Sequence, residues 1–218
     1  MKAHRKLKYA FYARTDVLRI AKELLGKVLV SSTDGVLTSG MIVECEAYTG
    51  EKDKAAHVYG GKRTQRTEKM YGDAGHAYIY FCYGMHHLIN VVTHSKGVPH
   101  AVLLRALEPL EGIDIMMERR KKAKLDHTLT RGPGSLCQAL GIHTNQNGIS
   151  LTGNNVWIED HGLVIDPSAI ACGPRIGVDY AGEDALLPYR FWLKDNPYVS
   201  KVPAKKKQTK RTKKPHLE

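Results

Sequence analysis

The spacing of apolar residues predicts one helix near the start of the chain, followed by two strands. Thr15 and Asp16 precede an apolar face that repeats every three to four residues, which is typical of an amphipathic helix that Gly26 ends. This face consists of Val17, Leu18, Ala21, Leu24 and Leu25. Residues 27–31 form a short apolar run and residues 40–48 alternate apolar and polar side chains, so we expect a strand in each.

The middle of the chain predicts three more strands. Residues 77–83 and 88–93 are apolar segments separated by a turn sequence that contains Gly84, which indicates a β-hairpin. Residues 101–107 form the next apolar segment. Strands that follow one another along the chain favour an antiparallel sheet.

Helices and loops complete the predicted elements. Residues 110–122 and 135–140 have the pattern of helices, and Gly141 ends the second one. Residues 49–75 are polar and rich in glycine, which is typical of a loop with room for a short helix, and the segment after residue 141 alternates short strands with loops. The order of elements predicts an α+β (mixed α/β) fold, a single domain with a mainly antiparallel sheet and flanking helices.

The positive charge is concentrated at the end of the chain. The whole sequence of 218 residues carries a net charge of +11, and residues 201–218 hold eight Lys or Arg against one Glu. We therefore expect a globular domain over residues 1–203 and a basic, disordered tail over residues 204–218. Lys205, Lys206 and Lys207 are candidate contacts to phosphate, although a nuclear-import signal or a plain solvated end would have the same composition.

Composition argues against several other classes of protein. No apolar run approaches the ~18 residues that a membrane span requires. The four cysteines form no Cys-x-x-Cys pair and neither His57 nor the pair His86-His87 has a recognisable third ligand, so we expect reduced thiols, no metal and no cofactor. These features predict an intracellular protein, which would be cytoplasmic and associated with the nucleoid in a bacterium, or nuclear in a eukaryote.

Two carboxylates and an aromatic ring share one face of the strand over residues 40–48. Side chains alternate along a strand, so Glu44, Glu46 and Tyr48 point one way, and Val43, Cys45 and Ala47 point to the core. A carboxylate beside a ring can hold a water molecule and take its proton. An ordinary solvated strand face would have the same pattern, and the pattern does not separate Glu44 from Glu46.

The predicted hairpin is rich in aromatic residues. Tyr78 and Tyr80 share a face, and Tyr83 lies at the turn. An aromatic side chain in a cavity can stack on an extruded base, and one at a turn can wedge between bases. Packing within a sheet would also explain them.

Arg105 lies in an otherwise apolar segment and needs a partner if it is buried. A phosphate or an active-site carboxylate would serve, and so would a structural ion pair with Glu108 or Glu111.

Several motifs, taken in order, resemble those of the alkyladenine (3-methyladenine) DNA glycosylases of the mammalian type. The resemblance extends from about residue 10 to residue 203, and its specificity comes from the ordered set. The motifs are residues 44–48, 55–57, 80–85, 104–112, 132–133 with 136–140, and 175–178 before 181–182. The family fold is one compact domain with a curved antiparallel sheet and a protruding β-hairpin, and it uses no metal.

The resemblance implies a role for each candidate residue in the chemistry. Glu46 would be the general base that positions and deprotonates the attacking water, which settles the choice between the two carboxylates. Arg105 would help to hold this water and a nearby phosphate. Tyr48, His57 and Tyr80 would line the pocket and stack on the extruded base.

The resemblance also implies how duplex DNA is bound and which purines are selected. Tyr83 would enter the minor groove and fill the space that the base leaves, with Met85 beside it, and Asn90 would discourage guanine through its 2-amino group. His86 stands where the family has a bulkier aromatic residue, and the Lys-rich tail has no family counterpart that we can place.

The implied function is a monofunctional, monomeric DNA glycosylase of base-excision repair. It would flip out alkylated or deaminated purines such as 3-methyladenine, 7-methylguanine, hypoxanthine and ethenoadenine, and hydrolyse the N-glycosidic bond. Three alternatives stay open, of which a sugar-specific hydrolase is disfavoured by the basic tail. A non-catalytic binder of damaged DNA would not need Glu46, and a bifunctional glycosylase/lyase would use a lysine that borohydride can trap.

Overall fold

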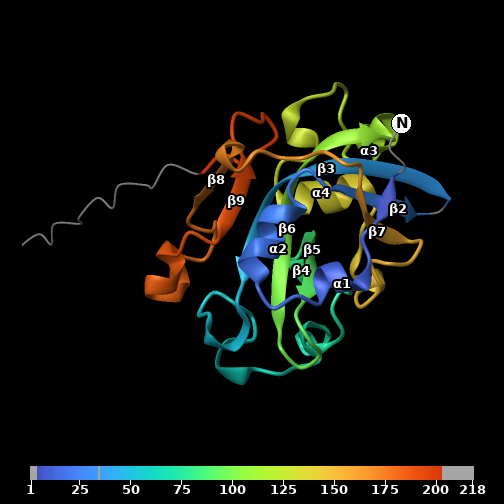
Figure 1. Cartoon of the computed structure of the whole chain (residues 1–218). Helices are drawn as coiled ribbons and strands as arrows, with labels where there is room; N and C mark the ends of the chain where they lie inside the picture. Colours follow the sequence, from blue (N-terminus) through green and yellow to red (C-terminus); the bar gives the residue numbers. More distant parts are fainter. Residues whose placement is uncertain (1–3, 34, 203–218) are drawn as a thin grey trace, which may run out of the picture.

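A nine-stranded sheet forms the centre of the computed structural model, which describes residues 4–33 and 35–202 (Figure 1). The strands are β1 (Arg5–Lys6), β2 (Val28–Thr33), β3 (Val36–Tyr48), β4 (Ala77–Cys82), β5 (His86–Thr93), β6 (His100–Glu111), β7 (Val156–Asp160), β8 (Ile170–Gly173) and β9 (Arg190–Leu193). Their main order is β1-β7-β2-β3-β6-β5-β4, with β9 added to β3 and β8 added to β9. All of these pairings are antiparallel, which confirms the predicted fold class.

Strand β3 is the longest strand and the one around which the sheet curls. One of its edges pairs with β6, and the other is shared, with β2 beside its first half and β9 beside Glu44–Glu46. The register against β6 shifts between Ile42 and Glu44 and again between Glu44 and Cys45. Such bulges bend a strand and increase its twist. The bend falls where the two carboxylates lie.

In the described part of the chain, four α-helices and seven short 3-10 helices accompany the sheet. The α-helices are α1 (Tyr9–Tyr12), α2 (Val17–Leu24), α3 (Ile113–Arg119) and α4 (Pro133–Leu140). The 3-10 helices are η1 (Gly50–Lys52), η2 (Tyr59–Gly61), η3 (Glu68–Tyr71), η4 (His127–Leu129), η5 (Thr144–Gln146), η6 (Pro167–Ala169) and η7 (Asp179–Leu186). The first three lie within the segment predicted to be a loop. None of the described helices is long and apolar enough to cross a membrane.

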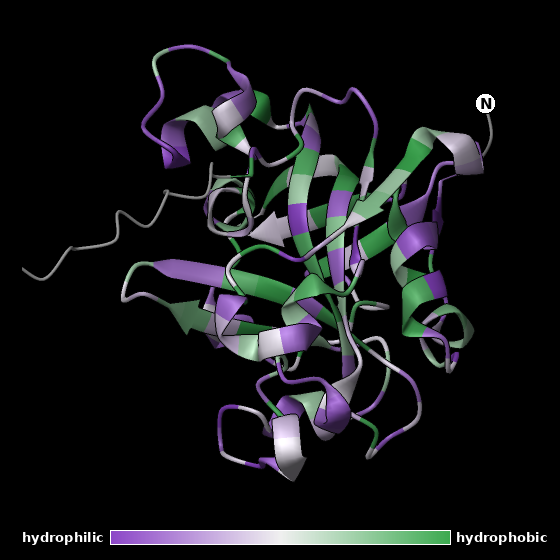
Figure 2. Ribbon diagram, turned by 90° about the vertical axis from the view of Figure 1, so that its left-hand side faces the viewer, coloured by the Kyte–Doolittle hydropathy of each residue, from purple (hydrophilic) through white to green (hydrophobic). Residues whose placement is uncertain are grey.

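Helix α2 and the expected inner face of β3 meet in the main core. The Asp16 side chain caps α2 by accepting a hydrogen bond from Arg19 N (2.9 Å). Val43, Cys45 and Ala47 are fully buried, and Cys45 Sγ donates to Ala21 O (3.0 Å). Figure 2 shows hydrophobic residues along the strands and on the helix faces that cover them, while the loops are mostly hydrophilic.

The predicted helix over residues 110–122 is wrong at both ends. Leu110 and Glu111 are the last residues of β6, and α3 covers only Ile113–Arg119. Gly112 separates the two with φ 70°, and a Cβ there would lie 2.6 Å from Leu37 O. Only glycine fits such a close approach, so the chain leaves the sheet and starts the helix at this residue.

Candidate active site

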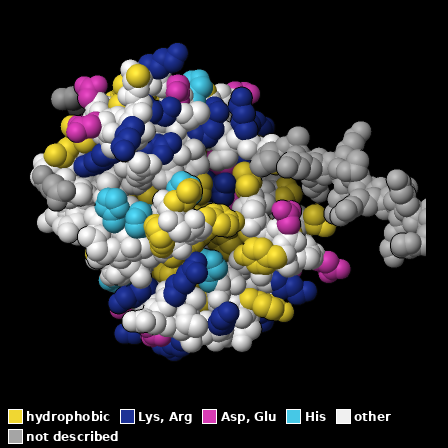
Figure 3. Space-filling model, turned by 180° about the vertical axis from the view of Figure 1, so that it is seen from behind, with side chains coloured by type: hydrophobic (Ala, Val, Ile, Leu, Met, Phe, Trp, Pro, Cys, Tyr) yellow, Lys and Arg dark blue, Asp and Glu magenta, His cyan; other side chains and the backbone are white. Residues whose placement is uncertain are grey.

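A cavity of about 490 Å³ lies at one end of the curled sheet. Its walls come from the end of β3, the loop before β4, the β4–β5 hairpin, β6, and the segment that joins β8 to η7. Figure 3 views the molecule from behind, and hydrophobic side chains gather there around a hollow with Lys and Arg side chains above and below it. The described part of the chain thus brings most of the sequence-predicted residues to one place. Those that line the cavity are Tyr48, His57, Tyr80, Tyr83, Asn90 and Arg105.

Glu46 lies directly behind this cavity and is fully buried. Its Oε1 accepts a hydrogen bond from Ile176 N (2.7 Å), and its Oε2 accepts one from the Tyr48 hydroxyl (2.9 Å). Arg105 Nη1 is 3.2 Å from Oε1. The solvated-face interpretation of these carboxylates is therefore wrong. Glu46 is a buried, fixed carboxylate whose three polar neighbours all belong to the cavity wall.

Glu44 is also fully buried, but its two hydrogen-bond donors do not line the cavity. It accepts hydrogen bonds from Arg190 Nε (2.6 Å) and from Ser200 N (2.8 Å). Among the described residues that line the cavity, Arg105 is the one that approaches it, with Nε 3.3 Å from Glu44 Oε1. The neighbours of the two carboxylates therefore distinguish Glu46, which is held by the cavity wall, from Glu44, whose hydrogen-bond donors lie outside it. The alternation of side chains along the strand could not make this distinction.

Arg105 is positioned by the irregular pairing of β3 with β6, since Ala106 pairs with Glu44 and Leu104 with Cys45. Burial by itself would lower the pKa of Arg105, but Glu46 and Glu44 outweigh this effect and raise the pKa. The sequence left a phosphate, an active-site carboxylate or a structural ion pair as possible partners of Arg105. The structure shows that its partners are the two carboxylates of β3. Within the described residues no ion pair links Arg105 to Glu108 or Glu111, and Glu108 instead accepts a hydrogen bond from Asn196 Nδ2 (2.7 Å).

An aromatic wall faces the cavity opposite β3. The rings of Tyr78 and Tyr80 stack with centroids 5.4 Å apart, and the His57 ring stands edge-on to Tyr80 at 4.7 Å. His57 Nδ1 is 3.0 Å from the Tyr78 hydroxyl. Burial, reinforced by Arg66 and Lys62, lowers the pKa of His57 to about 4. The imidazole is therefore neutral at pH 7, so this wall presents flat, uncharged rings.

Asn90 lies at the base of this wall and is buried. Its Nδ2 donates to Tyr78 O (3.1 Å), across the pairing of β4 with β5. The hydrogen bond fixes the orientation of the amide beside the aromatic rings.

The hairpin tip holds Tyr83 in a strained conformation at the mouth of the cavity. Tyr83 has φ 52° and Gly84 has φ 68°, and Met85 N donates to Cys82 O (3.2 Å). Positive φ at both central residues is typical of the tight turns of hairpins, but it is uncommon for an aromatic residue. Tyr83 is 85% exposed and Met85 is 68% exposed. The turn thus presents two large apolar side chains to solvent.

A buried ion pair that the sequence analysis did not predict connects three segments of the site. Arg175 and Asp53 form two hydrogen bonds (2.5 and 2.8 Å), with side chains 0% and 1% exposed. Arg175 also donates to Ala47 O (3.0 Å), and its guanidinium lies 4.7 Å from the centre of the Tyr48 ring. No local pattern marks Asp53, because its partner lies far away in the sequence. Arg175 belongs to the family motif over residues 175–178, but the resemblance implied no role for it.

Two other exposed residues complete the wall without having been predicted. Arg66 lies over the Tyr80 ring, 4.9 Å from its centre, and the Tyr180 hydroxyl donates to Ala55 O (3.0 Å). Both residues lie in polar segments without a periodic pattern, so the sequence did not mark either one as part of the site. Lys205, Lys206 and Lys207, which we expected to bind DNA, lie outside the described residues.

Comparison with known proteins agrees with this geometry. The profile of the family described as Methylpurine-DNA glycosylase matches residues 10–197. A protein of Bacillus cytotoxicus is 49% identical over 194 residues, which cover 85% of this chain and 95% of that protein. One of Clostridium acetobutylicum is 49% identical over 202 residues, which cover 89% and 97%. Both carry the name "Putative 3-methyladenine DNA glycosylase". The chain therefore belongs to the Methylpurine-DNA glycosylase family of DNA-repair hydrolases, which act on N-glycosyl bonds.

Proposed function

We propose that this protein flips a damaged purine out of duplex DNA into the cavity and hydrolyses its N-glycosidic bond, without cleaving the strand. The observation that carries the proposal is the buried carboxylate of Glu46, fixed by three groups of the cavity wall behind a slot of aromatic rings. A stacking surface for a flat base thus adjoins a group that can accept a proton.

The aromatic wall supports a purine as the bound base. Tyr80, Tyr48 and the neutral ring of His57 provide surfaces on which a heterocycle can stack, whether it is neutral or carries the positive charge of an alkylated base. We place 3-methyladenine first, following the names of the relatives, with 7-methylguanine, hypoxanthine and ethenoadenine as further substrates. Asn90 would exclude guanine by contact with its 2-amino group.

In the proposed reaction, the bond between the sugar C1′ and the base breaks first, and the base leaves with the electron pair. The sugar then has oxocarbenium character, which a nearby carboxylate stabilises. Water adds to C1′ and gives its proton to Glu46. Arg105 contacts both buried carboxylates and keeps Glu46 in place, and together with Arg190, which pairs with Glu44, it balances their negative charge.

Tyr83 is the proposed wedge. The residue is exposed at a turn beside the cavity mouth, where it can occupy the gap that the extruded base leaves in the duplex, with Met85 against the neighbouring bases. Backbone strain at an exposed aromatic residue is consistent with a functional requirement.

The absence of a lysine among the described residues that line the cavity supports hydrolysis over a lyase reaction, which requires an amine nucleophile. We propose further that the protein acts as a monomer on chromosomal DNA, in the cytoplasm of a bacterium like those of its relatives.

The test is single-turnover excision from a duplex with one 3-methyladenine, hypoxanthine or ethenoadenine, read as strand breaks after alkali. We expect Glu46→Gln to bind the damaged duplex with unchanged affinity and to lose excision by a factor of 100 or more. Glu111→Gln, an exposed carboxylate at the end of β6, serves as the matched control and should retain full activity.

Each other outcome identifies a different function or a different general base. If the wild-type protein binds these duplexes and excises none of the bases, it is a damage binder on a glycosylase scaffold. If borohydride traps a covalent complex with damaged DNA, the protein is a lyase as well. If Glu46→Gln excises normally, the general base is another residue.

A further inference from the structure

Two histidines and a glutamate converge at the edge of the sheet where β1 pairs with β7. Arg5 pairs with Asp160 and Lys6 with Glu159, so the antiparallel register places His4 directly opposite His161. Glu159 is two positions before His161 and shares its face of the strand. The His4 and His161 rings stack with centroids 3.6 Å apart and planes inclined by 11°.

The potential ligand atoms of this group, His4, Glu159 and His161, lie close enough together to reach one metal ion once the two stacked rings turn, because the in-plane lone pairs of parallel imidazoles do not converge on one point. His161 Nε2 is 2.8 Å and His4 Nδ1 is 3.9 Å from Glu159 Oε2, and one ligand atom from each residue lies within 4.8 Å of the others. Bonds of ~2.0–2.1 Å in a tetrahedral zinc site separate neighbouring ligand atoms by about 3.3 Å. The two observed distances to the carboxylate lie on either side of this value.

The carboxylate is also oriented by a neighbour. Trp157 Nε1 donates to Glu159 Oε1 (2.6 Å), which leaves Oε2 directed at the two imidazoles. Carboxylates that bind metals are commonly held by such a hydrogen bond on the other oxygen. The Glu159 side chain is 18% exposed and that of His4 is 60% exposed, so an ion has a path from solvent.

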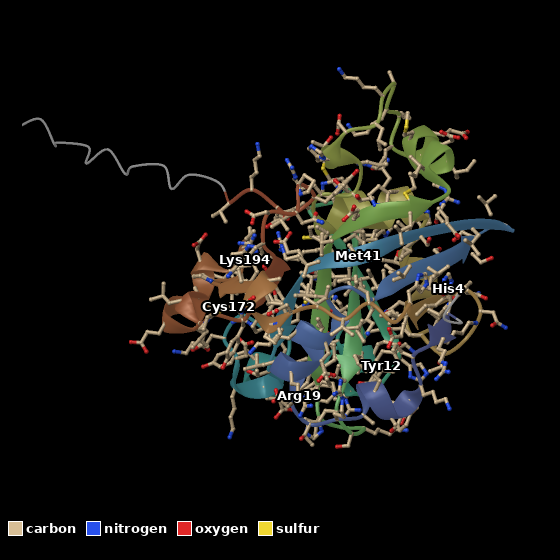
Figure 4. The ribbon with its side chains drawn as sticks, turned by 45° about the horizontal axis from the view of Figure 1, so that its top comes forward. His4, Tyr12, Arg19, Met41, Cys172 and Lys194 are labelled. Atoms are coloured by element: carbon tan, nitrogen blue, oxygen red, sulfur yellow. The ribbon has the colours of Figure 1, made fainter. Side chains whose placement is uncertain are left out.

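We propose that His4, Glu159 and His161 form a binding site for a divalent transition-metal ion, with Zn²⁺ as the ion of best fit and solvent as the fourth ligand. The site would attach the short strand β1 to β7. None of its three residues lines the cavity. In Figure 4, His4 lies on the opposite side of the molecule from Cys172 and Lys194, which belong to the β8–β9 region. The proposal is therefore independent of the glycosylase reaction.

A stacked pair of histidines on one carboxylate has another explanation, in which His161 only donates a hydrogen bond to Glu159 and the group binds no ion. The two explanations differ in what happens when zinc is added. A hydrogen-bonded group with a purely structural role gives no saturable zinc binding, whereas a ligand set binds one ion per chain.

The test is calorimetric titration of the full-length, metal-free protein with ZnCl₂ at pH 7.5, together with thermal unfolding with and without zinc. We expect one zinc site per chain and a higher unfolding temperature in zinc. His161→Ala and Glu159→Gln should each weaken binding at least tenfold and abolish the temperature shift. Glu159→Gln keeps an oxygen for Trp157 and serves as the variant that is least disruptive to folding.

His94→Ala is the matched control. His94 and His100 also lie ring to ring, at 5.0 Å, but belong to no ligand group among the described residues. This variant should bind zinc like the wild type, and because every variant keeps the same cysteines, differences report on the proposed group. Binding that is unchanged in both His161→Ala and Glu159→Gln, or the absence of a saturable site in the wild type, would overturn the proposal.

Discussion

Breaking the buried ion pair between Asp53 and Arg175 tests how the site is assembled. Asp53→Asn removes one charge and leaves the guanidinium of Arg175 inside the protein. Asp53 also accepts hydrogen bonds from Thr49 N (3.1 Å) and Ala55 N (2.9 Å), one on each oxygen. An asparagine amide has one oxygen only, so its NH₂ group would face one of these donors.

The expected loss of stability is large because both partners are shielded from water. Their side chains are 0% and 1% exposed, and removal of one partner of such a pair costs about 3–5 kcal/mol. With a urea slope of about 2 kcal/mol per molar, the unfolding midpoint should fall by roughly 2 M. The ion pair anchors both the Tyr48 ring and the segment that leads to His57. Without it, excision by the folded fraction of the protein should fall as well.

The assay is urea unfolding followed by circular dichroism at pH 7, with excision measured in the absence of urea. Glu68→Gln is the control, because it breaks the Arg63–Glu68 pair whose side chains are 57% and 51% exposed, and it should leave the midpoint within error. If Asp53→Asn lowers the midpoint no more than Glu68→Gln does, the ion pair does not hold these segments together.

Three other expectations follow from residues described above. The pKa of His57 is about 4 in the folded protein and near 6.5 in the unfolded chain, so the stability that its neutral ring contributes is complete above pH 6.5 and is lost as the pH falls towards 4. Urea unfolding at pH 7.0, 5.5 and 4.5 should therefore show that the wild type loses up to about 3 kcal/mol relative to His57→Gln. If the stabilities of the two proteins change in parallel with pH, the shifted pKa is contradicted. Tyr83→Gly relieves a positive φ and should stabilise the free protein by about 1 kcal/mol while lowering excision from duplex DNA, so a destabilised variant would show that the turn is not strained. Removal of residues 204–218, which carry seven Lys or Arg, should weaken DNA binding and reduce its salt dependence without changing the preference among lesions, and an unchanged salt slope would show that the tail does not contact phosphate.

The alternation of side chains made part of the site predictable. It placed Glu44, Glu46 and Tyr48 on one face of β3 and Cys45 in the core, and these positions are confirmed. Likewise, Gly84 between two apolar segments predicted the hairpin. Strand alternation and turn residues involve positions that are neighbours in the chain, so a single sequence is enough to recognise them.

The contacts that separate the two carboxylates depend on distant segments and had no local signal. Arg190 and Ser200 bury Glu44, and the backbone of Ile176 fixes Glu46, although all three lie more than a hundred positions away. The end of β6 was mistaken for a helix because the polar and apolar residues around Gly112 fit both the helical and the strand period. The close approach of Gly112 to Leu37 O decides where the strand ends and the helix begins.

The position of β3 has a consequence for the rates at which backbone amides exchange with solvent. Around Glu44–Glu46 the strand is paired on both edges, with β6 and with β9, so we expect these amides to exchange with deuterium more slowly than those of the edge strands. The turn at Tyr83 is largely exposed, with the Tyr83 side chain 85% exposed, so we expect its amides to exchange through local opening. Under the proposed function, the turn that would enter the duplex can therefore move while the strand that carries Glu46 stays paired on both edges.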